Sequence, residues 1–187
     1  KFDLMLDIGC RCKDLKDARY LLEGLYELNF KFVEEPIARS PINYFNLNKK
    51  KFKKPKIAYG ENVSSLEEII PMLKNKVIDI FQPDTNLLLP RELKTITEIS
   101  RNNKIEIIPH NWFNLVNFSS NLNYLIPIQN KNKLMEYNIL KNPYNSLFIN
   151  NMFKIKNNTL SLKRFKGSGI DINLRKISKF KIYEIKN

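Results

Sequence analysis

The sequence predicts an α/β fold in which short strands alternate with helices and build part of a parallel (β/α) barrel. Short apolar runs alternate with segments whose apolar residues recur at helical spacing, which is typical of this class. A residue with a metal-binding or catalytic side chain follows each of six apolar runs, at intervals of 23 to 27 residues. These residues are Asp7, Glu34, Glu61, Asp84, His110 and Glu136. Because barrel enzymes carry their chemistry at the carboxyl ends of the strands, the pattern predicts one shared active-site rim.

The first predicted elements are two strands separated by a helix. Residues 2–6 form a strand, and Asp14 caps a helix whose apolar residues recur at i, i+3 and i+4. Residues 30–33 form the next strand. The segment after Pro36 is irregular and has room for one short helix.

The middle of the chain continues the alternation. Residues 56–59 form a strand, and Ser65 with Glu68 has the spacing of a capping box that opens a helix. Residues 77–81 form the fourth strand, and Pro90 is well suited to the first turn of the helix that follows and runs to about residue 102.

The pattern weakens toward the end of the chain. Residues 105–108 form a strand, residues 113–124 a weaker Asn-rich helix, and residues 134–135 a short sixth strand. Beyond Pro143 the segments are irregular or extended, with a turn at residues 157–158. We therefore divide the chain into a barrel segment, residues 1–162, and a tail, residues 163–187. The tail contains a GSG bend at 167–169 and a strand-like segment at 179–185.

The length of the chain limits how much of a barrel it can form. A complete eight-unit barrel takes about 250 residues, whereas this chain has 187 residues and six strand ends. We therefore expect a partial barrel with two unpaired edges, which would not form a stable, active monomer by itself.

The composition of the chain limits the classes of binding partner and the cellular location that we predict. The net charge of +13 raises the alternative of nucleic-acid binding, but the densest lysine cluster, residues 49–56, is expected on the face opposite the rim. We predict no nucleic-acid partner. Cys10 and Cys12 do not make a disulfide framework, which favours a reduced, cytoplasmic location. No apolar run reaches the roughly 20 residues of a membrane helix, so we predict no membrane partner.

The residue types at the rim suggest one kind of chemistry. Asp7, Glu34 and Glu61 supply only oxygen ligands, which suit Mg²⁺; three separate salt-bridged acids are the alternative. Asp84 can orient His110 as a general base, although a single histidine after a strand can also be purely structural. Glu136 can donate a hydrogen bond to a developing oxyanion if its pKa is raised. Together these groups suit proton abstraction next to a carboxylate, with a metal-stabilised enediolate.

These residues lie in stretches that resemble the enolase superfamily. The stretches are LMLDIG, FVEEPIA, IAYGENVSSLEE, IDIFQPD, IIPHNW, LMEYN and, in the tail, FKGSGIDIN. In this order they resemble the C-terminal barrel domain of proteins like mandelate racemase and muconate lactonizing enzyme, and within these the mandelate racemase subgroup. The resemblance implies about strands 3 to 8 of a TIM-type barrel plus a C-terminal tail. The superfamily's N-terminal capping domain and first barrel strands have no counterpart here.

The resemblance also implies residue roles. Asp7, Glu34 and Glu61 are the implied Mg²⁺ ligands, Asp84 with His110 the general-base dyad, and Glu136 the electrophilic or orienting acid. Glu35 is implied to be a structural neighbour. The chain departs from the pattern at Gly9, at the TNLLLP segment after Asp84, and at Lys166.

By the same resemblance, the expected activity is Mg²⁺-dependent dehydration of a sugar acid to a 2-keto-3-deoxy acid. A racemase or epimerase that uses the same enolisation step is the first alternative, and a truncated barrel without catalytic activity is the second. The expected partner is a small-molecule carboxylate, and the intact protein is expected to be a homo-oligomer.

Overall fold

The structure is a computed structural model that describes residues 2–49, 51–112, 114–128 and 134–180. The chain divides into two compact units, Lys1–His110 and Asn111–Asn187. The domain boundary expected after residue 162 stays a prediction.

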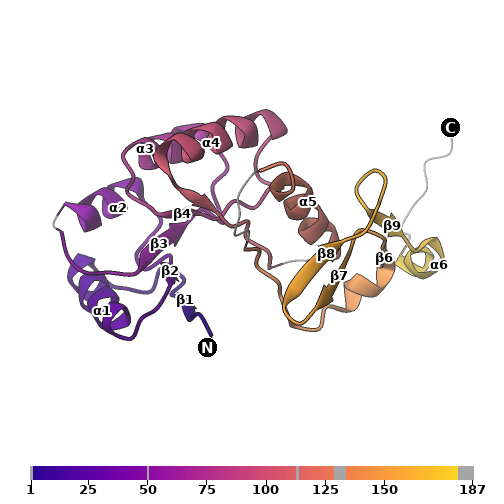
Figure 1. Cartoon of the computed structure of the whole chain (residues 1–187), viewed down its shortest axis with the longest axis horizontal. Coiled ribbons are helices and arrows are strands. Elements are labelled where there is room, and N and C mark those ends of the chain that lie inside the picture. The colour runs from indigo at the N-terminus through magenta and orange to yellow at the C-terminus, as the bar shows by residue number, and fades with distance from the viewer. Residues whose placement is uncertain (1, 50, 113, 129–133, 181–187) are drawn as a thin grey trace. The chain divides into compact units, whose positions relative to one another are not determined.

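The first unit is built around a sheet of five parallel strands in chain order. The strands are β1 (Met5–Asp7), β2 (Phe32–Glu34), β3 (Lys56–Tyr59), β4 (Ile80–Phe81) and β5 (Glu106–Ile107). The connecting helices are α1 (Leu15–Glu27), α2 (Pro41–Asn48), α3 (Leu66–Lys74) and α4 (Pro90–Asn103). The helices lie along one face of the sheet, and each contacts the next (Figure 1). This arrangement confirms the predicted α/β fold and its partial barrel.

Side-chain caps explain where two of these helices begin. Asp14 accepts hydrogen bonds from the backbone N–H groups of Lys16 and Asp17, at 2.7 and 2.9 Å, and so satisfies free donors in the first turn of α1. Ser65 Oγ accepts a longer bond, 3.4 Å, from the N–H of Glu68 at the start of α3. The carboxylate of Glu68 accepts a hydrogen bond from the Tyr59 hydroxyl, and thereby ties α3 to the end of β3.

The core of the first unit lies between the strands and the helices. Apolar side chains from both layers are completely or almost completely buried there: Leu22, Val33, Leu47, Ile57, Leu73, Ile80, Phe81 and Ile96. All three residues of β2 are buried. This packing fixes the positions of the strand ends relative to one another.

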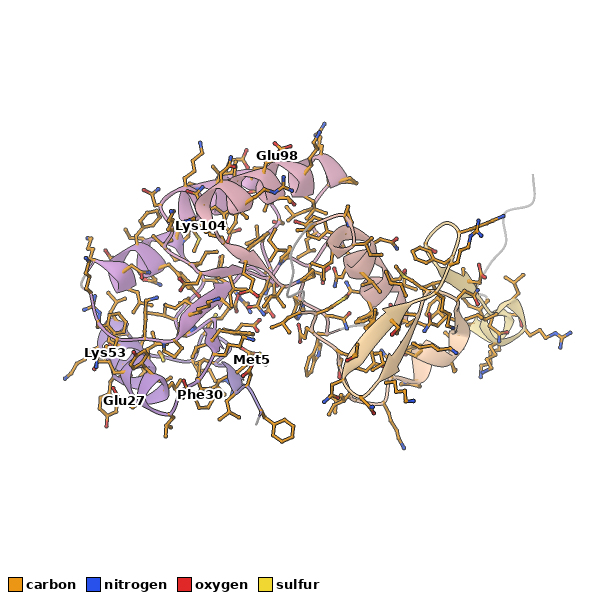
Figure 2. The ribbon with its side chains drawn as sticks, viewed as in Figure 1. Met5, Glu27, Phe30, Lys53, Glu98 and Lys104 are labelled. Atoms are coloured by element: carbon orange, nitrogen blue, oxygen red, sulfur yellow. The ribbon has the colours of Figure 1, made fainter. Side chains whose placement is uncertain are left out.

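The sheet has two outer strands. Among the described strands, β1 pairs only with β2 and β5 only with β4. Phe2, Leu4 and Met5 are exposed along the β1 edge, where Figure 2 labels Met5.

The second unit combines a helix with short antiparallel strands. Its elements are α5 (Leu115–Leu125), η1 (Pro143–Leu147), β6 (Phe148–Asn150), β7 (Phe153–Lys156), β8 (Thr159–Leu162), β9 (Ile170–Ile172), α6 (Leu174–Ile177) and η2 (Ser178–Phe180). Strand β6 pairs with β9, and β7 pairs with β8. The core comprises Phe118, Leu122, Met152 and Phe153.

Two turns of the second unit confirm the sequence interpretation. Asn157 and Asn158 join β7 to β8 and both have positive φ, 50° and 55°, as a two-residue type I′ hairpin requires. The GSG segment is also a turn, and it is held against α5 because Ser119 Oγ and Asn123 Nδ2 both donate to the carbonyl of Ser168.

The strand expected at residues 134–135 is wrong. These residues are irregular, and the side chain of Met135 packs against the core of the second unit, so two apolar residues did not suffice to define a sixth strand. In the strand-like segment at 179–185, Lys179 and Phe180 belong to η2, and residues 181–185 lie outside the described residues. In the part of the chain that is described, no helix has the length and apolar character needed to cross a membrane.

Candidate active site

Three of the predicted site residues stand at the carboxyl ends of adjacent parallel strands. Asp7 ends β1, Glu34 ends β2, and the two are direct partners in the strand register. Glu61 follows the last residue of β3, Tyr59, by two positions. Because parallel strands end at one edge of a sheet, their backbones bring all three carboxylates to the same rim.

A glycine makes the turn that presents Glu61. Gly60 has φ +135°, which side chains rarely permit. A Cβ at this position would lie 2.5 Å from Cε2 of Phe81, a fully buried ring on β4. The chain can therefore leave β3 in this direction only because residue 60 has no side chain.

Glu34 is held by a glutamine that sequence reasoning did not select. Gln82 follows β4 and donates from Nε2 to Glu34 Oε2 at 2.8 Å, and both side chains are buried. The backbone N–H of Gln82 bonds to the carbonyl of Tyr59 at 2.9 Å, which fixes its position beside β3. Gln82 directly precedes Pro83-Asp84 in the IDIFQPD stretch, and this position near the end of a predicted strand could have identified it as a site residue.

His110 lies between two carboxylates. Its Nδ1 is 3.7 Å from Asp84 Oδ2, its Nε2 is 3.3 Å from Glu61 Oε2, and its side chain is 12% exposed. A hydrogen bond from its backbone N–H to the carbonyl of Pro83, 3.1 Å, positions the residue beside the end of β4. Asp84 Oδ1 in turn accepts two bonds from Asn86, each 3.0 Å. The structure thus brings Asp84, His110 and Glu61 together.

An arginine that the sequence did not single out joins two of the rim's glutamates. Arg39 Nε donates to Glu35 Oε2 at 2.6 Å, and its Nη2 donates to Glu61 Oε1. Residues 35–39 are not helical, so neither the four-residue spacing of Glu35 and Arg39 nor the spacing of Arg39 and Glu61 indicated these contacts. Asn62 Nδ2 also donates to Glu61 Oε1, at 2.7 Å.

Glu35 connects this network to Cys10. The Glu35 side chain is almost fully buried, and burial raises the pKa of its carboxyl. Cys10 Sγ donates to Glu35 Oε2 at 3.2 Å. Burial, followed by this hydrogen bond and the charge of Glu35, raises the pKa of the Cys10 thiol to about 12. Cys10 is therefore a protonated donor at neutral pH and not a nucleophile.

We expect the alkylation rate of Cys10 at pH 8 to be more than about a hundredfold lower in the folded protein than in the unfolded chain. The reason is that only the thiolate reacts with the alkylating agent. Because the pKa is raised to about 12, the rate should rise about tenfold with each pH unit and level off only near pH 12. Iodoacetamide time courses with peptide mapping by mass spectrometry measure this. The Glu35→Gln variant should react faster but remain below the unfolded reference, because burial persists. A native rate within tenfold of that reference would contradict the assignment.

Glu136 belongs to the second unit. Its Oε2 accepts a hydrogen bond from the backbone N–H of Asn111 at 2.7 Å, and Asn111 is buried. The nearby segment is tied to the same stretch by a bond from Asn138 Nδ2 to the carbonyl of Trp112, 2.8 Å. The oxyanion role of Glu136 stays a prediction.

The expected Mg²⁺ ligands fit the ion in their chemistry. All three are carboxylates from neighbouring strand ends, the hard oxygen donors that Mg²⁺ prefers. Among the residues that the structure describes, however, no three His, Cys, Asp or Glu side chains are grouped closely enough to hold a metal. Glu61 instead contacts Arg39, Asn62 and His110. The three expected ligands thus stand at neighbouring strand ends without being grouped around one point, and Glu61 is engaged by a cation of the protein.

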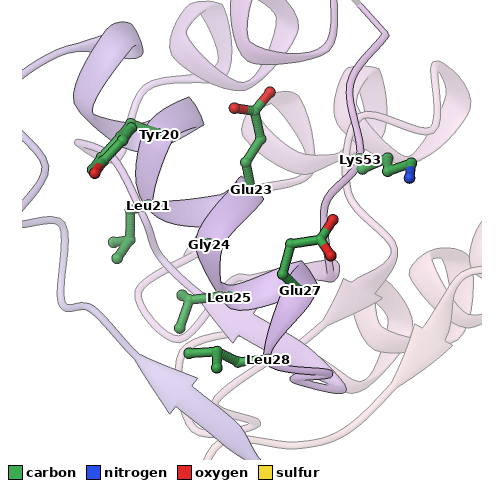
Figure 3. Close-up of a pocket in the computed structure, with 8 residues that line it drawn as sticks. All are labelled: Tyr20, Leu21, Glu23, Gly24, Leu25, Glu27, Leu28 and Lys53. Carbon is green, nitrogen blue, oxygen red and sulfur yellow. The ribbon is translucent and has the colours of Figure 1, made fainter.

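A hollow on α1 lies away from this rim. It has a volume of about 590 Å³ and is lined by residues of α1 and the following turn, including Tyr20 and Leu28, and by Lys53 (Figure 3). Leu28 lies close in sequence to the start of β2, whereas Glu34 stands at that strand's other end. This hollow is therefore not part of the candidate active site.

Known proteins share this architecture. The family model described as "Enolase C-terminal domain-like" matches residues 1–177. No curated protein matches the chain's sequence. Three similar solved structures carry different descriptions.

An enolase from Agrobacterium radiobacter, described as a candidate galactarate dehydratase and bound to Na and L-malate, has a TM-score of 0.83 and 18% identity over 100% of this chain and 51% of its own. An enolase from Pantoea ananatis with bound D-gluconate and Mg has a TM-score of 0.79 and 21% identity over 95% and 42%. A candidate L-alanine-DL-glutamate epimerase from Burkholderia xenovorans has a TM-score of 0.81 and 20% identity over 95% and 44%. The chain thus spans about half the length of these proteins or less, and at these identities the likeness shows the fold.

Proposed function

The chain belongs to the enolase C-terminal domain-like family, and on that premise we propose that it carries the base and the metal ligands of a Mg²⁺-dependent sugar-acid dehydratase. The reaction begins with removal of the proton next to the substrate's carboxylate, and loss of the β-hydroxyl then yields a 2-keto-3-deoxy acid. The position of His110 between Asp84 and Glu61 is the observation that carries this proposal.

His110 has the surroundings of a general base. A carboxylate at Nδ1 favours the tautomer with the proton on that nitrogen, and so leaves the lone pair on Nε2. Asp84 lies on the Nδ1 side, and Asn86 holds its other oxygen. Nε2 points toward the rim formed by the strand ends, where Glu61 lies. His110 can therefore take the α-proton on Nε2 and return it to the departing hydroxyl.

Asp7, Glu34 and Glu61 would hold Mg²⁺, and Gln82 would keep the Glu34 carboxylate in place. When bound, the ion would withdraw electron density from the substrate's carboxylate and make the α-proton more acidic. The gluconate and Mg in the Pantoea ananatis structure support a sugar acid as the substrate class and Mg²⁺ as the ion. Glu136 is proposed as the acid that faces the developing oxyanion.

We also propose that the protein is cytoplasmic and that it forms a homo-oligomer.

The full-length gene product tests the proposal when it is incubated in D₂O with a panel of sugar acids, with Mg²⁺ or with a chelator. Mass spectrometry follows deuterium at the α-carbon, and a carbonyl assay follows keto acid. We expect at least one acid to give keto acid only with Mg²⁺.

Other outcomes lead to different functions. Exchange or inversion without keto acid would replace dehydration by epimerisation, the reaction class named for the Burkholderia xenovorans protein. Keto acid that forms equally in chelator would exclude the metal from the reaction. No exchange with any acid, together with no Mg²⁺ binding, would favour a barrel without catalytic activity.

A further inference from the structure

One guanidinium group connects the carboxylates that follow two adjacent strands. Arg39 lies between β2 and α2, and it donates to Glu35, just after β2, and to Glu61, just after β3. The Glu35 side chain is 1% exposed and is shielded from water, the Glu61 side chain is 21% exposed and is partly shielded, and Arg39 itself is 40% exposed. The contact is therefore anchored at a buried acid and reaches outward to a proposed metal ligand.

The charge of Arg39 is permanent. A guanidinium does not lose its proton in proteins, so the cation is present beside Glu35 and Glu61 at every working pH. Glu34 is the residue before Glu35, and Asp84 lies on the other side of His110, so several carboxylates share this rim. Clustered carboxylates without a cation would be protonated or would destabilise the fold. Arg39 supplies a positive charge beside Glu35 and Glu61 when no metal is bound.

The Oε1 atom of Glu61 is already engaged by donors, and Oε2 lies beside His110. Oε1 accepts from Arg39 and Asn62, and Oε2 faces His110 Nε2 at 3.3 Å. A divalent ion that bound the Glu61 carboxylate would have to displace the guanidinium or lie close to its positive charge. Both requirements oppose metal binding. Arg39 therefore affects metal binding even though it cannot itself be a ligand.

We propose that Arg39 is a built-in counter-ion of Glu61 which competes with Mg²⁺ and sets the metal affinity of this rim. The inference rests on the proposed function, because it takes Glu61 as a metal ligand. In the metal-free protein Arg39 pairs with Glu61, and metal binding releases that contact while the bond to Glu35 stays.

Isothermal titration of Mg²⁺ into the metal-free, full-length gene product, without substrate, tests this. We expect Arg39→Met to bind Mg²⁺ about tenfold more tightly than the wild type, because the competing charge is removed. Lys56→Met is the matched control: it also removes one cation from the first unit, but from an exposed pair with Glu106 at the start of β3. Its affinity should stay within about twofold of the wild type.

Thermal melting adds a readout that needs no metal. Metal-free Arg39→Met should melt at a lower temperature than the wild type, Mg²⁺ should raise its melting temperature more, and adding Glu61→Gln should restore part of the loss by removing the unpaired charge. If Arg39→Met does not fold, Arg39→Lys, which keeps the charge but cannot bridge both glutamates, should bind Mg²⁺ about threefold more tightly than the wild type.

Equal or weaker Mg²⁺ binding by these variants, with measurable binding by the wild type, would overturn the role of Arg39 and leave the proposed function intact. Absence of Mg²⁺ binding in every variant and in the wild type would overturn both, since the metal would then not use this rim.

Discussion

The His110→Asn variant of the full-length gene product should lose α-proton exchange and keto-acid formation by about three orders of magnitude, within the 10²–10⁴ range typical of general acid–base groups. The reason is local: His110 is the chain's one histidine, and it lies between Asp84 and Glu61 with its side chain 12% exposed. Asparagine keeps a polar group of similar reach but cannot accept a proton at neutral pH. Exchange rates in D₂O at saturating Mg²⁺ measure the effect.

Two companion measurements separate catalysis from folding. Mg²⁺ binding and the melting temperature of His110→Asn should remain close to those of the wild type, because no proposed metal ligand is removed. Asp84→Asn should also slow exchange, since the neutral amide holds the imidazole tautomer less strongly. Exchange by His110→Asn within threefold of the wild-type rate would show that another group removes the proton.

The Gly60→Ala variant should be destabilised by about 2–6 kcal/mol, the sum expected for forcing a side chain into a filled core and into an unfavourable backbone region. Its Cβ would lie 2.5 and 2.6 Å from two atoms of the Phe81 ring and 3.3 Å from the backbone N of Gln82. Phe81 is fully buried and cannot move aside without disturbing β4. Urea unfolding, followed by circular dichroism, measures the change in free energy.

Gly24→Ala is the matched control for Gly60→Ala. Gly24 lies within α1, and a Cβ there would meet nothing within 4 Å among the described residues. Because alanine favours helix more than glycine does, this variant should be more stable by about 0.5–1 kcal/mol. If Gly60→Ala proved as stable as the wild type, the turn into Glu61 could not have the conformation described here.

Much of the fold was predictable because its determinants are local. The apolar run 56–59 was predicted as a strand with the bounds that β3 has, and Asp14 was identified as the cap of α1 from its position before a periodic helix. Side-chain caps and apolar periodicity act within one or two turns, so they can be found by inspecting the sequence. Residues 134–135 were misassigned because a run of two apolar residues does not distinguish a strand from a segment that packs elsewhere.

The candidate site was also predictable only where its determinants are local. The sequence determined which polar residues follow the strands, since the alternation of strand and helix places Asp7, Glu34 and Glu61 at strand ends by counting alone. Their roles as ligands remain predictions.

Only the tertiary structure decided which of these groups meet. The bond from Gln82 to Glu34 spans 48 positions and that from Arg39 to Glu61 spans 22, and neither follows from residue spacing. Such contacts depend on strand register, on the turn that Gly60 permits and on side-chain conformations within a packed rim. The sequence therefore determined the set of charged groups, while three-dimensional packing paired Glu61 with Arg39 and His110, because the partners of a charge are chosen by distance in space.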